Sequence, residues 1–228
     1  MERIYFFSPC GHSKAVAEFL KSKLDAETYD ILHISDENMT ADTAVVVFPV
    51  YCQNIPEKVT KFLLKLKAHF VAAVAVYGGI SYGNVIWETQ RLVGYKLIGA
   101  ACVPSGHTYL RESGNVELSK LEVFIERVRK PQIIRIAREK KNIFADFFPE
   151  WRSRIGVKIK KSGRCNNCGK CIKECTSGAM TDEGITGRCI RCLHCVNVCP
   201  QKALDFSLNP LLVLYLKQKR KNEWKLYL

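Results

Sequence analysis

The sequence has no apolar segment long enough to cross a membrane, since no run of about 18 apolar residues occurs in its 228 residues. The features of a secretory leader are also missing. Met1 to Phe7 leads directly into Ser8 and Pro9, without a charged region, a long apolar stretch and a cleavage site. We therefore expect a soluble, cytoplasmic protein. In a reducing cytosol its eleven cysteines indicate metal binding or redox work.

Acidic residues are in short supply. The chain has 22 Asp and Glu against 35 Lys and Arg, a formal net charge of +13, and residues 143–228 hold 16 of the basic side chains but only 7 of the acidic ones. No recognisable nucleic-acid-binding module accompanies this charge, so we expect no nucleic-acid partner. An acidic redox partner protein fits better, because opposite charges accelerate encounter.

Eight of the cysteines lie in two matching runs. The first run reads Cys165-x₂-Cys168-x₂-Cys171-x₃-Cys175, and the second reads Cys189-x₂-Cys192-x₂-Cys195-x₃-Cys199. Two residues between ligands let a tight loop wrap a cluster and direct successive thiolates at different iron atoms. Zinc sites and a disulfide framework are the alternatives. Zinc ribbons, however, use two separated CxxC pairs per ion, whereas these runs supply interlocking sets.

The repeated spacing resembles that of bacterial two-cluster ferredoxins, in which the fourth cysteine of each run binds the other run's cluster. The resemblance implies two [4Fe–4S] clusters. Cluster 1 would be held by Cys165, Cys168, Cys171 and Cys199. Cluster 2 would be held by Cys189, Cys192, Cys195 and Cys175. The first run departs from the pattern at Thr176, where the second run has Pro200.

Upstream of the cysteines, apolar runs alternate with segments of helical periodicity. Strands are predicted at residues 3–7, 29–34, 43–50, 70–77 and 97–103, and helices at 14–24, 56–67, 85–94 and 116–141. Right-handed crossovers turn such a series into an α/β, three-layer, doubly wound sheet of five parallel strands. Ligands of such sheets bind beyond the carboxyl ends of the strands.

Three loops, at residues 8–13, 49–55 and 77–84, are predicted to meet at that edge. The first joins a strand to a helix and holds a glycine flanked by hydroxyls, a form that binds phosphate through backbone N–H groups and a helix N-terminus. A simple helix cap is the alternative. The other two loops carry Tyr51, Tyr82, glycines and amides that could flank a flat heteroaromatic ring.

Residues 8–13 read Ser-Pro-Cys-Gly-His-Ser, which is similar in register to the flavodoxin phosphate loop, Ser/Thr-x-Thr-Gly-Asn-Thr/Ser. The whole chain thus resembles the flavodoxin–ferredoxin fusion proteins of anaerobic bacteria and archaea. It departs at Cys10, which replaces a hydroxyl, and at His12, whose cationic form could contact a phosphate. The resemblance implies a flavodoxin-like fold and bound FMN. The implied FMN-binding residues are Ser8, Cys10, Gly11, His12, Ser13, Pro49, Tyr51, Cys52, Gln53, Asn54, Gly78, Gly79, Tyr82, Gly83 and Asn84.

Four segments follow from these assignments. They are a flavodoxin-like FMN-binding domain (1–142), a packed connector (143–161), a small α+β 2[4Fe–4S] ferredoxin-like domain (162–206) and a C-terminal basic tail (207–228). The connector is rich in aromatic and basic residues and lacks the Gly and Ser content of a flexible tether. Residues 211–216 are expected to form a terminal helix that folds back on the protein.

Three functions fit these features. The first is an electron-transfer protein that passes electrons between two [4Fe–4S] clusters and FMN, since clusters carry single electrons and flavins carry one or two. The second is a non-enzymatic ferredoxin-type carrier or accessory module whose flavodoxin-like domain binds no flavin. The third is an FMN-dependent oxidoreductase with its own substrate, acting through Tyr82 or His107. A solvent-exposed loop histidine is the simpler interpretation of His107.

Overall fold

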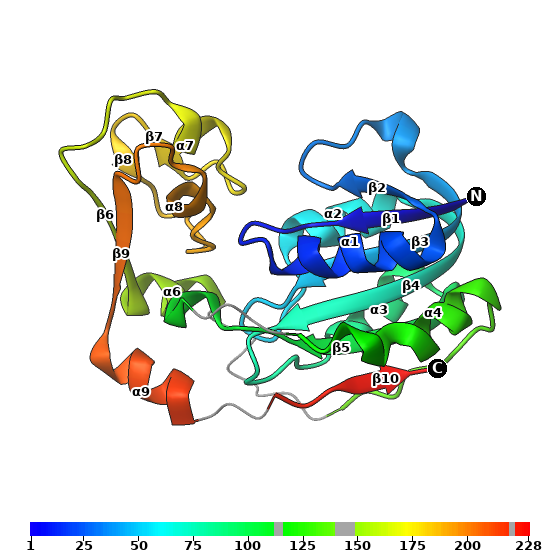
Figure 1. Cartoon of the computed structure of the whole chain (residues 1–228). Helices are drawn as coiled ribbons and strands as arrows, with labels where there is room; N and C mark the ends of the chain where they lie inside the picture. The colour runs from blue at the N-terminus through cyan, green and yellow to red at the C-terminus, as the bar shows by residue number, and fades with distance from the viewer. Residues whose placement is uncertain (112–115, 140–148, 219–221) are drawn as a thin grey trace.

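The computed structural model describes residues 1–111, 116–139, 149–218 and 222–228, with no side-chain detail for 149–152 and 218. Figure 1 shows a twisted sheet flanked by helices, with the cysteine-rich segment placed beyond one end of its strands. Within the described residues, no helix is long and apolar enough to span a membrane.

The strand order of the main sheet is β10-β5-β4-β3-β1-β2. Its parallel strands are β1 (Glu2–Phe6), β2 (Glu27–Asp30), β3 (Thr40–Pro49), β4 (Lys67–Tyr77) and β5 (Leu97–Pro104). The order 2-1-3-4-5 is that of the flavodoxin-like doubly wound fold. The prediction of a five-stranded parallel sheet is confirmed, and an antiparallel sixth strand is added to it. The strand predicted at 29–34 is misplaced, because β2 ends at Asp30 and residues 31–33 form a turn.

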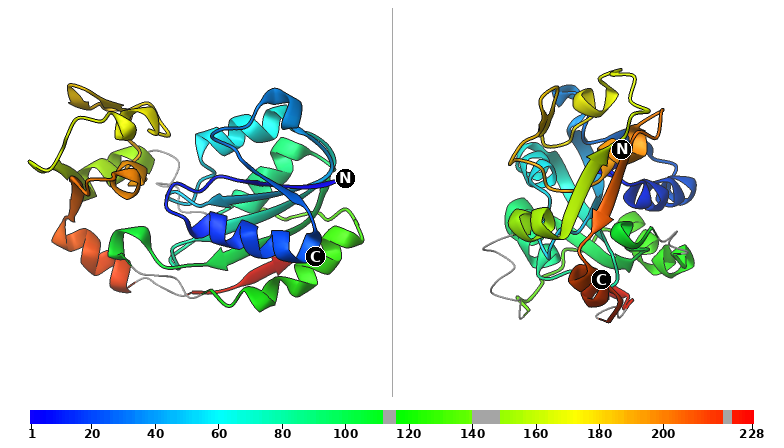
Figure 2. Two further views of the ribbon diagram at one scale, coloured as in Figure 1. Left: turned by 45° about the horizontal axis from the view of Figure 1, so that its top comes forward. Right: turned by 90° about the vertical axis from the view of Figure 1, so that its left-hand side faces the viewer.

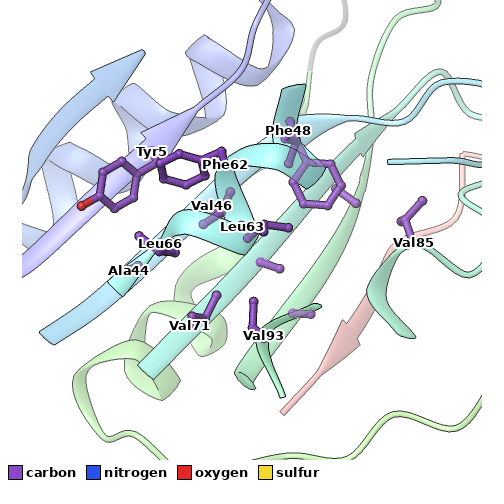
Figure 3. Close-up of a cluster of buried hydrophobic side chains, with 14 of the residues drawn as sticks. Tyr5, Ala44, Val46, Phe48, Phe62, Leu63, Leu66, Val71, Val85 and Val93 are labelled. Carbon is purple, nitrogen blue, oxygen red and sulfur yellow. The ribbon is translucent and has the colours of Figure 1, made fainter. Parts of the chain in front are cut away.

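Both faces of the sheet are buried. In β3, Val45 and Val47 belong to one core cluster while Val46 and Phe48 belong to the other, because side chains alternate between the faces of a strand. Helices α2 (Glu57–Lys65) and α3 (Val85–Val93) cover the second face, shown in Figure 3. Helices α1 (His12–Leu24) and α4 (Glu122–Arg129) cover the first. This explains why the central strands read as continuous apolar runs.

The predicted long helix over 116–141 is wrong. The chain forms a short 3-10 turn, η3 (Leu118–Leu121), and then α4, which ends at Arg129. Pro131 explains the stop, because proline disfavours helical geometry in the preceding residue, and Lys130 has φ −120° and ψ 78°. Residues 131–139 continue without helix or strand and pack Ile134 and Ile136 against the core.

The C-terminal end also differs from the expected basic tail. Helix α9 (Pro210–Gln218) forms as predicted, and it lies close enough to the connector that Leu212 would clash with any side chain at Gly156. The basic residues 219–221 lie outside the described residues. Beyond them, β10 (Lys225–Tyr227) pairs antiparallel with β5 at the edge of the main sheet. The chain therefore returns to the first domain after the cysteine-rich segment.

The cysteine-rich segment is built from short elements. Helix α6 (Pro149–Gly156) leads into β6 (Val157–Lys161), which pairs antiparallel with β9 (Leu204–Leu208). Between them lie α7 (Lys170–Lys173), the hairpin β7 (Met180–Thr181) with β8 (Gly184–Ile185), and α8 (His194–Val198). Strand β6 falls in the stretch that the sequence assigned to the connector. Further short 3-10 turns, η1 (Asp36–Asn38) and η2 (Thr108–Leu110), lie in loops of the first domain.

Candidate functional site

The loop between β1 and α1 has the backbone of an anion-binding turn. Gly11 has φ +89°, a left-handed conformation that favours glycine, and α1 begins at the next residue. The Ser8 hydroxyl accepts a hydrogen bond from the Lys14 N–H at 2.8 Å. The Ser13 side chain is buried, and its oxygen has no hydrogen-bond partner among the described residues. A rotation of this hydroxyl toward the cavity would let it donate to a phosphate at the N-terminus of α1.

Cys10 faces the second cysteine run. Its thiol donates to the carbonyl oxygen of Cys192 at 2.8 Å. Burial raises the pKa of Cys10 to about 12, and the nearby Cys192 thiol adds to the shift. The thiol is therefore neutral at physiological pH. It joins the loop after β1 to the loop of the second cysteine run.

Two further hydrogen bonds join the same loops. Nδ1 of His194 lies 2.8 Å from the Pro9 carbonyl oxygen, and the Tyr109 hydroxyl donates to the Arg191 carbonyl at 3.0 Å. The second run is thus attached directly to the predicted phosphate loop and to the loop after β5. Figure 2 shows the cysteine-rich segment beyond the carboxyl ends of the parallel strands, where ligands of this fold bind.

A cavity of about 910 Å³ lies between the two parts of the chain. Nine of the predicted FMN-binding residues line it: Ser8, Cys10, His12, Ser13, Pro49, Tyr51, Cys52, Asn54 and Gly78. From the other side, Cys175 and Cys192 line it together with Arg188 and Arg191. Its volume is within the range of small-molecule sites, which runs from about 300 to 1,000 Å³.

Cys52 and Gln53 form a strained turn at the edge of this cavity. Their φ angles are +49° and +68°, and the backbone groups of Tyr51 and Asn54 exchange hydrogen bonds of 3.0 and 2.9 Å. Such a two-residue turn needs positive φ at both central positions and usually takes Asn-Gly. Strain of this kind clusters at ligand sites.

The third loop meets the site only in part. Gly78 lines the cavity, and a side chain there would collide with His107, whose Cδ2 would lie 2.5 Å from the added carbon. The cavity lining found among the described residues does not include Gly11, Gln53, Gly79, Tyr82, Gly83 or Asn84.

Asn84 and Tyr82 have other contacts. The Asn84 amide donates to the Glu139 carbonyl at 2.6 Å and accepts from the Glu139 N–H at 2.8 Å, so it holds the segment after α4. The Tyr82 ring packs edge-on against Tyr77, with centroids 5.3 Å apart. Gly79 accepts a backbone hydrogen bond from Asn222. The loop at 77–84 is therefore held by Glu139 and Asn222, which come from later segments of the chain.

The sequence analysis missed the contribution of the loop after β5. Ser105, Gly106, Thr108 and Tyr109 line the cavity, and so does His107, which is half-buried and not solvent-exposed as expected. The imidazole of His107 accepts from the Tyr109 N–H at 3.3 Å. The position of this loop at the carboxyl end of β5 was the available signal.

The titratable side chains His12, Tyr51 and Tyr109 in the cavity are neutral at neutral pH, and basic side chains add positive charge, so the cavity suits an anion. Burial lowers the pKa of His12, so its neutral form is favoured at neutral pH, in contrast to the cationic role suggested by the sequence. Burial raises the pKa of Tyr51 and of Tyr109, which keeps both hydroxyls protonated. Positive charge comes from Lys58 and the two arginines of the second run, whereas Lys61 forms an ion pair at 2.5 Å with Glu57, which also lines the cavity.

Cysteines of the two runs are neighbours across the runs, and Cys195, which is close to Cys192, Cys189 and Cys175, also has Cys171 of the other predicted set nearby. The thiol of Cys171 has Cys165 and Cys199 as electrostatic neighbours, while that of Cys192 has Cys189 and Cys175. In the portion of the chain that is described, no three ligating side chains converge closely enough to hold one metal ion. A cubane cluster does not require this, because each of its irons takes a single cysteine.

Backbone N–H groups surround the last cysteine of each run. Ala179 donates to the Cys175 sulfur at 3.2 Å, and Ala203 donates to the Cys199 sulfur at 3.3 Å. Burial opposes ionisation of both thiols, but these and neighbouring backbone donors outweigh it and lower the pKa of Cys175 and of Cys199. Donors that stabilise a thiolate also stabilise a cluster ligand, so this cysteine set fits [4Fe–4S] binding.

Residues 137–218 match the family model of the 4Fe-4S dicluster domain. The chain is a fusion of a flavodoxin-like fold with a 4Fe-4S dicluster domain. The matched segment is therefore an iron–sulfur domain. No curated protein matches it.

Three solved structures are among those similar to the fusion. Rubredoxin oxygen:oxidoreductase from Desulfovibrio gigas is 13% identical over 57% of this chain and 35% of its own, with a TM-score of 0.46. A putative flavoprotein from Bacteroides uniformis is 14% identical over 49% of this chain and 97% of its own, with a TM-score of 0.37. A flavodoxin from the domain Archaea is 18% identical over 57% and 99%, with a TM-score of 0.38. The fusion spans about a third of the Desulfovibrio protein. The fold assignment rests on the strand order given above.

Proposed function

We propose that the fusion binds FMN in the cavity between its two parts and passes electrons between FMN and two [4Fe–4S] clusters. The observation that carries the proposal is the direct contact of the predicted phosphate loop with the second cysteine run, through Cys10 and Cys192. Bound FMN would exchange one or two electrons, whereas each cluster exchanges one. The chain would thus connect one-electron carriers with a two-electron partner or substrate.

Each group of residues has a role in this proposal. Ser8, Gly11 and Ser13 would hold the phosphate, while Tyr51 and the turn at Cys52 would contact the flavin ring. Cluster 1 would bind Cys165, Cys168, Cys171 and Cys199, and cluster 2 would bind Cys189, Cys192, Cys195 and Cys175. The neighbourhoods of Cys171 and Cys192 support this crossed arrangement.

A carrier or accessory module without flavin is the second candidate. One observation favours it: the Cys10 side chain, which replaces a hydroxyl of the flavodoxin loop, is engaged by the Cys192 carbonyl. Fewer donors then remain for a phosphate. The two candidates differ in a single property, which is flavin binding.

Anaerobic purification followed by absorption spectroscopy and by iron, sulfide and flavin assays separates them. The proposal predicts flavin bands on a broad cluster absorbance. Cluster absorbance with no FMN uptake on titration would support the carrier, and stoichiometric zinc without sulfide would contradict the clusters themselves.

The phosphate loop is tested by Gly11→Asp, with Gly11→Asn as the matched control. Both variants place a side chain at φ +89°, and nothing lies within 4 Å of the added carbon, so the two have the same backbone cost and no steric clash. They differ only in the negative charge of Asp. We expect Gly11→Asp to weaken FMN binding about tenfold more than Gly11→Asn, with equal riboflavin affinities, since like charges repel. Equal FMN affinities would place the phosphate elsewhere.

A further inference from the structure

The two predicted clusters differ in their surroundings. Cys175 and Cys192, both predicted ligands of cluster 2, line the cavity, whereas no predicted ligand of cluster 1 appears in its described lining. Cys168 is exposed. In Figures 1 and 2, the yellow-green segment that leads from β6 to α7, which carries the first cysteines, lies at the side of the cysteine-rich part remote from the main sheet. Cluster 2 would therefore face the flavin, and cluster 1 would face solvent.

The surface around cluster 1 is basic. From Lys158 to Lys173 the sequence has no acidic residue. The exposed side chains here form what we call the basic edge: Lys160, Lys161, Arg164, Lys170 and Lys202. Arg164 donates to the Lys202 carbonyl at 2.7 Å, which brings Lys202 next to the first run.

Two acidic residues of this part of the chain have basic or imidazole side chains beside them. Asp205 forms an ion pair with Arg111 at 2.5 Å, and Glu174 lies 3.8 Å from both His33 and His194. Within the described chain, no ion pair involves a lysine of the basic edge. Asp205 is also the ladder partner of Lys160 and an electrostatic neighbour of Arg164, so it offsets part of the charge of the edge. Five basic side chains against this one carboxylate still leave an excess of positive charge beside Cys168, an exposed predicted cluster ligand.

We propose that the basic edge is the docking site for an acidic one-electron carrier protein of the ferredoxin type, with cluster 1 as the partner-side cluster. That electrons continue from cluster 1 through cluster 2 to FMN rests on the proposed function, whereas the docking of the carrier does not. In each encounter the reduced carrier loses one electron and cluster 1 gains it, without bond or proton transfer. A nucleic acid could bind the basic side chains, but it could not exchange an electron with cluster 1, so we favour a protein partner that carries its own redox centre.

The test uses the full-length holoprotein and a small acidic 2[4Fe–4S] ferredoxin as the probe. In the test variant Lys160, Lys161 and Lys170 are all changed to Gln. The control changes three exposed residues, Lys21, Lys67 and Lys96, to Gln. Lys21 lies in α1, Lys67 begins β4 and Lys96 immediately precedes β5, so the last two lie at the amino ends of the parallel strands, away from the cysteine-rich segment. Both variants lose the same charge. Affinity is measured by calorimetry between the oxidised proteins at several salt concentrations, and cluster reduction by stopped-flow.

We expect the test variant to bind the ferredoxin about tenfold more weakly at low salt and to show a shallower salt dependence, because surface charge steers association. The control should match the unmodified protein. Electron paramagnetic resonance spectra and flavin content should be the same in all three proteins, which separates docking from assembly.

Equal losses in both variants, or in neither, would overturn the docking site. Tighter binding of an RNA or DNA oligonucleotide than of the ferredoxin, lost in the test variant alone, would assign the edge to nucleic acid and overturn the proposal. Absence of flavin with normal ferredoxin docking would contradict the proposed function and leave the docking site in place.

Discussion

Gly83 is a residue at which the loop after β4 packs tightly against the loop after β3. A side-chain carbon there would lie 2.6 Å from Gln53 Cβ and 2.7 Å from the Gln53 carbonyl oxygen, and φ is +60°. The sequence places this glycine among the flavin-binding residues. Its packing gives it a structural role that the sequence alone could not reveal, because the contact joins positions thirty residues apart.

We expect Gly83→Ala to destabilise the protein by about 2–4 kcal/mol, which combines the cost of left-handed backbone with that of overpacking. Gly11→Ala is the control. Gly11 is in the left-handed region, with φ +89° and ψ −26°, and has nothing within 4 Å of the added carbon, so only the backbone cost of about 1–2 kcal/mol applies. Urea unfolding followed by far-UV circular dichroism compares them. Equal losses would show that the Gln53 contact can relax.

His12 gives stability a pH dependence. Because burial lowers its pKa in the folded state, the unfolded chain binds the proton more readily. The stability that this histidine contributes is therefore present above the unfolded value of 6.5 and is lost as the pH falls through the folded value. We expect His12→Gln to reduce the fall in thermal midpoint between about pH 7 and pH 5, because the folded and unfolded states differ in proton binding below the unfolded value. An unchanged fall would mean that the ring is solvated in the folded protein.

Among the elements, β1, β3, β4 and β5 follow from the sequence because each is an apolar run between helical segments. β2 does not: the sequence predicts a strand at 29–34, but the strand lies at Glu27–Asp30, which is polar apart from Tyr29, so hydrophobicity placed it too far along the chain. The two other errors have physical causes. Periodicity continues past Pro131, although the backbone does not remain helical there. Strand β10 has three residues and pairs with a strand more than 120 positions away, so no local pattern reveals it.

Strand β10 closes the first domain. Trp224 and Leu226 pack against one core cluster, Tyr227 packs against the other, and the Lys225 ammonium and the Tyr227 hydroxyl both contact the Glu139 carboxylate. Removal of residues 222–228 should cost about 2–4 kcal/mol through lost apolar burial. It should also promote aggregation, since β5 becomes an exposed edge.

Thermal unfolding and light scattering test this truncation. Removal of Leu228 alone is the control, because that residue is exposed and lies beyond the strand. An unchanged midpoint in the longer truncation would mean that β10 contributes nothing to the stability of the sheet.

The crossed ligation of the two clusters by the two cysteine runs can be tested by substitution of the last cysteine of each run. If ligation is crossed, Cys199→Ser perturbs the cluster held mainly by the first run, and Cys175→Ser perturbs the cluster held mainly by the second. Each variant serves as the other's control in electron paramagnetic resonance. Damage confined to the cluster of the substituted run would show that each run binds its own cluster.

At the scale of the molecule, the cysteine-rich segment is inserted between β5 and β10, which are neighbouring strands of the main sheet. The segment is therefore connected to the first domain at both of its ends. The sequence indicates both cofactor types, since cysteine spacing and strand-to-helix loops are local patterns. It does not indicate which cluster faces the flavin. That assignment depends on contacts such as Cys10 with Cys192, which span 182 positions.

The central claim is that one chain holds a flavin and two clusters that exchange electrons. An anaerobic reductive titration, followed by absorbance and electron paramagnetic resonance, tests it most directly. The account predicts uptake of about four electrons per chain, one for each cluster and two for the flavin, with flavin bands bleaching during the titration. Uptake of about two electrons, with cluster signals alone and no flavin bands, would contradict it.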